Sequence, residues 1–78
     1  MKIFMFQSGN RTTFKFRYGF TPNRQAGNLP AEGAPWALMK ELDIGAAGGL
    51  TTKSPGIGAI LDSVHTKGFH LATANPLA

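Results

Sequence analysis

Residues 2–20 read KIFMFQSGNRTTFKFRYGF, two apolar and aromatic runs separated by a short polar stretch. Aromatic and β-branched residues favour extended strands, while Gly and Asn favour the tight turns that join them. The segment therefore predicts a β-hairpin with strands at residues 2–7 and 12–21 and a turn at residues 8–11. We expect this hairpin to form the first two strands of the sheet.

The two predicted strands differ in how they distribute their side chains. The second alternates, with four aromatic residues on one side and Lys15, Arg17 and Gly19 on the other, as in a strand with one buried face. The first is apolar on both sides at residues 3–6. We expect it to lie in the middle of a sheet or to be covered on both faces.

The register of the hairpin decides which face carries the rings, because a slip of one residue exchanges the two faces. If Gly9 and Asn10 form a two-residue loop, Phe4 pairs with Lys15, and Phe4 and Phe6 lie on the face of the cations. Rings flanked by cations suit a single nucleic acid strand, since rings stack on bases and cations contact phosphates.

A three-residue loop at residues 9–11 gives the other register. Phe4 then faces Phe16, Phe6 faces Phe14, and an all-aromatic face forms the core. The cations of the second strand are left without rings beside them, which supports charge attraction but not stacking. Turn chemistry allows both registers, and the sequence leaves the choice open.

Residues 22–35 contain three prolines and two glycines and predict an irregular surface loop that wraps one sheet edge. Residues 36–44, which follow Pro35, contain good helix formers and predict a first helix, with a strand of the same length as the alternative. We expect Trp36 to be a packing anchor for the proline-rich loop.

The second predicted helix covers residues 55–67. Ser54 is suited to its N-cap, Gly68 to its left-handed C-terminal end, and its apolar residues recur at helical spacing. These apolar residues are Ile57, Ile60, Leu61 and Val64. Residues 69–74 then alternate as a short final strand.

Together these elements predict one α+β domain over residues 1–78 with the order β-β-α-α-β. The simplest arrangement is a three-stranded antiparallel sheet, order 2-1-3, with the last strand beside the doubly apolar first strand and both helices on one face. An open sheet this small leaves strand edges exposed, so a homodimer through a sheet edge is a candidate assembly.

The charge of the chain is unevenly distributed. The net charge is +4, yet residues 1–31 hold five cations and no acid, whereas residues 32–78 hold three cations and four acids. This asymmetry favours an anionic partner for the N-terminal part, either a nucleic acid or an acidic protein.

Several function classes have little support in the sequence. There is no cysteine, the four acids form no paired arrangement, and His65 and His70 lack the spacing of metal ligands on one helix face. The stretch before Lys53 lacks the glycines that a nucleotide-hydrolysing loop needs. The first apolar run stops at Gln7, too short for a membrane span. We expect a cytoplasmic protein that is not an enzyme and uses no cofactor or metal.

The function that these patterns favour is a small binding module whose basic, aromatic N-terminal hairpin contacts an anionic macromolecule, with nucleic acid the preferred partner. An alternative is a protein-interaction or inhibitor module, of the kind that mobile elements encode, using the sheet edge, the proline-rich loop and Trp36. A third is a homodimeric structural protein. The candidate partner-binding residues are Lys2, Phe4, Phe6, Arg11, Lys15, Arg17 and Arg24.

Overall fold

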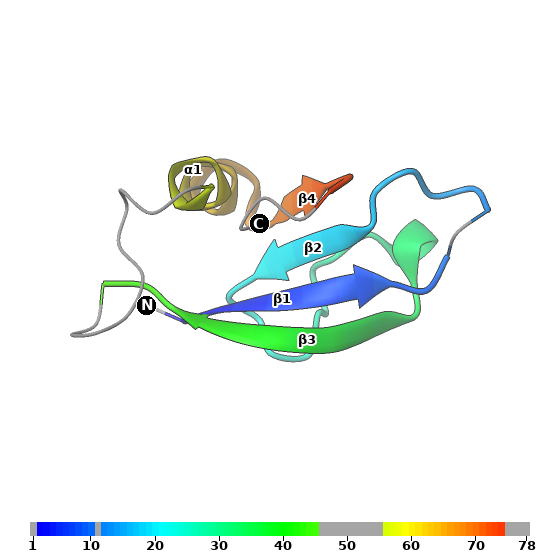
Figure 1. Ribbon diagram of the computed structural model, residues 1–78, viewed down its shortest axis with the longest axis horizontal. Coiled ribbons are helices and arrows are strands. Elements are labelled where there is room, and N and C mark those ends of the chain that lie inside the picture. Colours follow the sequence, from blue (N-terminus) through cyan, green and yellow to red (C-terminus); the bar gives the residue numbers. More distant parts are fainter. Residues whose placement is uncertain (1, 11, 46–55, 75–78) are drawn as a thin grey trace.

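The computed structural model describes residues 2–10, 12–45 and 56–74, which form a four-stranded antiparallel sheet and one α-helix. The α+β class predicted from the sequence is therefore confirmed. The spatial order of the strands is β3-β1-β2-β4 (Figure 1). The elements are β1 (Lys2–Ser8), β2 (Tyr18–Thr21), the 3-10 turn η1 (Ala31–Gly33), β3 (Trp36–Asp43), α1 (Ile57–Lys67) and β4 (His70–Ala72).

β1 is the central, doubly covered strand that its sequence predicts. It pairs with β2 on one side and with β3 on the other. Ile3 and Met5 pack in the cluster that contains the apolar face of α1, whereas Phe4 and Phe6 pack with Leu29 on the opposite side. The sheet therefore has a helix on one face and the loop of residues 22–35 on the other.

The largest departure from the sequence prediction is β3. Residues 36–44 were expected to form a helix, yet Trp36–Asp43 is a strand beside β1, with Lys2 opposite Asp43 and a bulge opposite Met5. A helix of nine residues gains little from propensity alone, because most helical stability in proteins comes from packing. Pairing with the apolar central strand outweighs that preference, so the strand alternative is the correct one.

The strand at β3, in place of the predicted helix, also changes the order of strands in the sheet. Because β3 occupies the free side of β1, the final strand cannot lie there, and β4 instead pairs with β2, with Tyr18 opposite Ala72. The predicted three-stranded order 2-1-3 is wrong for this reason. The expectation of two helices on one face is also wrong, since α1 alone covers that face among the described residues.

The hairpin forms, but neither predicted register is right. Phe4 lies opposite Thr21 rather than Lys15 or Phe16, and residues 12–17 belong to the connection instead of the strand. The last bond of the ladder runs from the Ser8 N–H to the Arg17 carbonyl at 2.8 Å. A short turn at residues 8–11 is thus replaced by a longer loop.

The helix prediction agrees well with α1. Ile57, Ile60 and Val64 are buried in the core beneath it, and Gly68 closes it in the left-handed region with φ of 88°. The proposed cap at Ser54 and the stretch before Lys53 lie outside the described residues. No helix in the described part of the chain has the length and apolar character needed to cross a membrane.

The loop of residues 22–35 forms a second apolar layer rather than a loose crossover. Its Leu29 is buried against Phe4 and Phe6, and Trp36 packs on the same cluster. The Trp36 indole N–H donates to the Pro30 carbonyl at 2.9 Å, so this tryptophan anchors the proline-rich loop as expected. Its location in β3, rather than at a helix start, is the only difference.

We expect the Phe4→Ala substitution to cost about 3 to 5 kcal/mol of the free energy of unfolding, because Phe4 is only 7% exposed. A loss of that size approaches the whole stability of a small domain, so Phe4→Leu, at about 1 to 2 kcal/mol, is the companion variant. Urea denaturation measures both. Leu38→Ala, at a side chain that is 49% exposed, is the control and should change stability by only about 0.5 kcal/mol. Equal losses for Phe4→Leu and Leu38→Ala would contradict the burial of Phe4.

Candidate functional site

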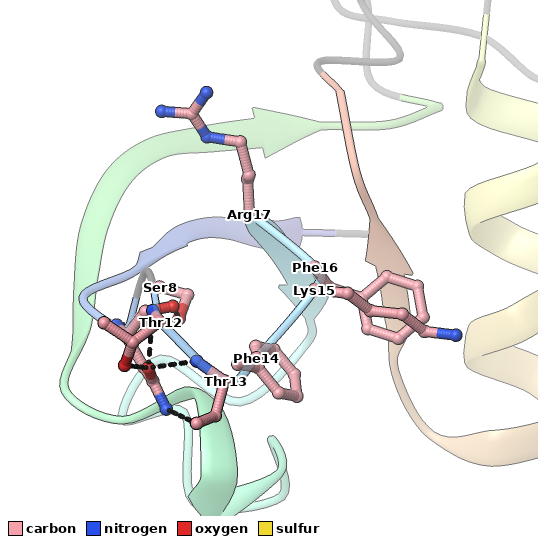
Figure 2. Close-up of a pocket in the computed structure, with 8 residues that line it drawn as sticks. Ser8, Thr12, Thr13, Phe14, Lys15, Phe16 and Arg17 are labelled. Atoms are coloured by element: carbon pink, nitrogen blue, oxygen red, sulfur yellow. Dashed lines mark hydrogen bonds between the residues drawn. The ribbon is translucent and has the colours of Figure 1, made fainter.

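The loop between β1 and β2, residues 9–17, surrounds a hollow of about 460 Å³, shown in Figure 2. That volume lies in the range of small-ligand pockets. The hollow combines hydroxyl, amide, aromatic and cationic side chains within one short stretch of chain. Its lining residues are Ser8, Asn10, Thr12, Thr13, Phe14, Lys15, Phe16 and Arg17.

Asn10 organises this loop through both ends of its side-chain amide. Its Oδ1 accepts from the Thr12 N–H and the Thr12 hydroxyl, both at 3.1 Å, and from the Thr13 N–H at 3.3 Å. Its Nδ2 donates to the Glu32 carbonyl at 2.7 Å and to Thr13 Oγ1 at 2.9 Å. Asn side chains commonly replace backbone partners in turns in this way. The amides that a longer second strand would offer to β1 are therefore used inside the loop.

A buried serine ties the loop to the layer beneath it. The Ser8 hydroxyl donates to the Gly33 carbonyl at 2.6 Å and accepts from the Asn10 N–H at 3.2 Å. Gly33 itself allows the closest approach in this region, because a Cβ there would collide with Trp36 and would lie 2.7 Å from the Phe14 ring. The start of the loop is thus held against η1 by specific packing.

The aromatic rings of the loop form a row that begins at Trp36. Phe14 makes edge contacts with Trp36 and with Phe16, each with ring centroids 5.7 Å apart. Edge-to-face contacts of this kind stabilise aromatic pairs beyond the area that they bury. Phe14 and Phe16 are both partly exposed, so the row extends from the apolar layer to the surface of the hollow.

Two cations among the described residues, Lys15 and Arg17, border the hollow. The Lys15 ammonium lies 5.2 Å from the centroid of the Phe16 ring, within the range of a cation–π contact. Figure 2 shows the Arg17 side chain leaving the loop in a different direction from Lys15 and Phe16. Both cations are exposed, and neither forms an ion pair with any described residue. Their charges are thus available to an anionic ligand.

Four other predicted site residues, Lys2, Phe4, Phe6 and Arg24, do not join this surface. Phe4 and Phe6, at 7% and 3% exposure, are core residues, because the loop of residues 22–35 covers them. Lys2 lies at the opposite end of β1, where its Nζ is 2.9 Å from Glu41 Oε1, and this contact raises the pKa of Lys2. The charge of Arg24 opposes that rise in pKa, so Arg24 lies near Lys2, and it does not line the hollow. Arg11 lies outside the described residues.

A second, smaller hollow of about 210 Å³ adjoins the first at Phe16. His70 Nδ1 lies 2.9 Å from Ser63 Oγ there, and the pKa of His70 is lowered by burial and by the charge of Lys67. The lining residues are Phe16, Ser63, Lys67, Phe69, His70 and Leu71.

Sequence reasoning missed most of these polar residues. The order Asn-x-Thr-Thr at residues 10–13 was a usable signal for a side-chain-capped turn, and it would have predicted the long loop. Ser63 and Lys67 carried no such signal, because their position beside Phe16 depends on β4 pairing with β2.

The described residues contain no group of three or more potential metal-ligating side chains. No protein-family model, curated protein or solved structure matches the chain. The chemistry of the two hollows is therefore the basis for any functional inference.

We expect Asn10→Ala to lower the free energy of unfolding by about 1 to 2 kcal/mol and to speed hydrogen exchange of the Thr12 and Thr13 amides, because these lose their acceptor. Asn10→Asp is the comparison variant, since it keeps the acceptor oxygen of residue 10 while a carboxylate oxygen replaces the donor to the Glu32 carbonyl and Thr13 Oγ1. Its amides should stay protected. The same exchange rates in both variants would show that the side-chain oxygen does not hold the loop.

Proposed function

We propose that this protein is a small, non-enzymatic binding module that takes single-stranded nucleic acid at the loop between β1 and β2. One observation carries the proposal. The hollow of about 460 Å³ is lined by the rings of Phe14 and Phe16 and bordered by Lys15 and Arg17. Rings for bases beside cations for phosphates are the pair of features that single-strand binding requires.

The geometry favours a single strand over a duplex. The rings lie within a hollow, so a base must leave its neighbours to reach them, and single strands present such bases. The cations leave the loop in different directions, which suits a backbone that passes along the rim (Figure 2). The loop is also ordered before binding by Asn10 and Ser8, which lowers the entropic cost of taking a ligand.

An acidic protein is less well matched to the same surface. Carboxylates would pair with Lys15 and Arg17, but they would leave the hollow and its rings unused. A nucleotide uses both features at once. Two measurements therefore distinguish a nucleic acid from an acidic protein. One is the salt dependence of the affinity, and the other is the loss of affinity when a ring is removed.

The test is fluorescence anisotropy with a labelled oligothymidylate of eight nucleotides at several salt concentrations. Affinity should fall as salt rises, because each phosphate contact releases counterions. The variant Lys15→Gln with Arg17→Gln should reduce the slope of log affinity against log salt by about 1.4, or about 0.7 for each contact. Phe16→Leu should weaken binding with little change in that slope, because it removes stacking and leaves the charges.

The charge-matched control is Arg24→Gln with Lys40→Gln, which also removes two of the exposed cations and lowers the net charge from +4 to +2. It should keep the wild-type slope, since neither residue borders the hollow. Equal effects of the two double variants would show that net charge alone attracts the strand. No binding at low salt would end the proposal.

A second candidate function is self-association through the outer edge of β3. Among the described strands β3 pairs only with β1, and the side chains of Leu38 and Met39 on it are 49% and 50% exposed. An edge strand with exposed apolar residues is a template for pairing with a second chain. The proline-rich loop and Trp36 contribute less to such an interface, because both are used in packing over Phe4 and Phe6.

Sedimentation equilibrium over a wide concentration range tests this second candidate. A dimer that uses the β3 edge should be weakened at least tenfold by Leu38→Lys, because a charge would replace an apolar contact at the pairing edge. The same substitution at Ala59, exposed on α1, is the control and should leave the association unchanged. A monomer at every concentration would exclude the candidate.

A further inference from the structure

The two hollows share one residue, Phe16. Phe14 and Arg17 of the loop line the first hollow with Phe16, and residues of α1 and β4 line the second hollow with it. Figure 2 shows Lys15 and Phe16 extending together on the same side of the loop, away from Arg17. A chain that leaves the first hollow past Phe16 would therefore enter the second.

The polar residues of the second hollow suit an anion. Lys67 is exposed, and within the described part of the chain it has no ion pair and no acidic side chain lines the hollow. Ser63 Oγ lies 2.9 Å from His70 Nδ1, so the neutral pair keeps one donor proton for a ligand, and a protonated ring would leave both the Ser63 hydroxyl and the second ring N–H free to donate. Phe69 and Leu71 supply apolar walls that increase the effect of the charge.

We propose that this second hollow binds the phosphodiester next to the base held in the first hollow, so that the strand crosses Phe16 and is contacted at a base and at the adjoining phosphate. Lys67 supplies the charge, and Ser63 and His70 supply hydrogen bonds. This inference rests on the proposed single-strand function and extends it to α1 and β4. It predicts that residues more than forty positions from the loop belong to the same binding surface.

The protonation of His70 provides a readout that a structural role would not produce. The groups that act on its ring are Ser63 and Lys67 of α1 and Phe20 of β2, and Phe16 of the loop lines the same hollow. Burial, and then the charge of Lys67, lowers the pKa of His70 in the free protein. A bound phosphodiester favours the charged ring and raises that pKa, so binding takes up a proton. Affinity should then increase as pH falls through the interval between the free and bound pKa values.

The experiment uses an oligothymidylate of eight nucleotides without terminal phosphates, because a terminal phosphate titrates near pH 6 and would obscure the effect. Salt slopes are measured at pH 8, where His70 is neutral in the free protein. Lys67→Gln should reduce the slope by about 0.7, the value for one contact to a single strand. Lys40→Gln removes the same charge from β3 and should leave the slope unchanged.

The pH arm compares His70→Asn with His65→Asn. Asn at residue 70 can still accept from Ser63 but cannot gain a proton, so the increase in affinity at low pH should disappear. His65 is exposed on α1 and lines neither hollow, so its variant should retain that increase.

The outcomes separate this inference from the function on which it rests. If the wild-type protein does not bind the oligonucleotide at all, the proposed function fails and the second site fails with it. If the Lys15 and Arg17 double variant loses slope while Lys67→Gln and His70→Asn behave as wild type, the loop site stands and the second site is overturned. Loss of slope in Lys67→Gln together with loss of pH dependence in His70→Asn supports the second site.

Discussion

The burial of four successive apolar residues in β1 is the constraint on which the rest of the structure depends. Residues 3–6 need cover on both faces of the sheet and a neighbouring strand on each side. The apolar face of α1 covers one side, and Leu29 with the proline-rich loop covers the other. A short chain without cysteine has few other means of stabilising a core, so β2 and β3 pair with this strand, α1 and the proline-rich loop cover its two faces, and β4 joins the sheet through β2.

That constraint explains which parts of the fold could be predicted. β1 and α1 were predictable because their patterns are local: a doubly apolar run, and an apolar helix face that ends at Gly68. Residues 36–43 were not, because their preference for a helix is overruled by pairing with β1, and such pairing depends on distant sequence. The position of β4 beside β2 follows from the same pairing of β3 with β1. The predicted register of the hairpin was wrong for a different reason, because the Asn10 side chain accepts hydrogen bonds from the Thr12 and Thr13 amides inside the loop.

The candidate site was predictable only in part. The concentration of cations in the first 31 residues is visible in the sequence, but the sheet places Lys2 at the opposite end of β1 from Lys15 and Arg17. Lys2 is engaged by Glu41, whereas Lys15 and Arg17 remain unpaired beside the hollow. The rings that the sequence favoured, Phe4 and Phe6, are in the core, and Phe14 and Phe16 are exposed in their place. The composition thus predicted a basic, aromatic surface, but the residues that form it depend on the register of the hairpin.

The loop that carries this surface also packs against the core, so residues of the proposed site contribute to stability. Phe14 contacts Trp36 and approaches Gly33, while Ser8 fixes the start of the loop to the Gly33 carbonyl. Trp36 in turn rests on the layer that covers Phe4 and Phe6. A ligand stacked on the row of rings would therefore contact side chains that are already fixed by packing, and it would not have to order the loop. The same apolar layer that covers β1 thus holds the rings where a ligand can reach them.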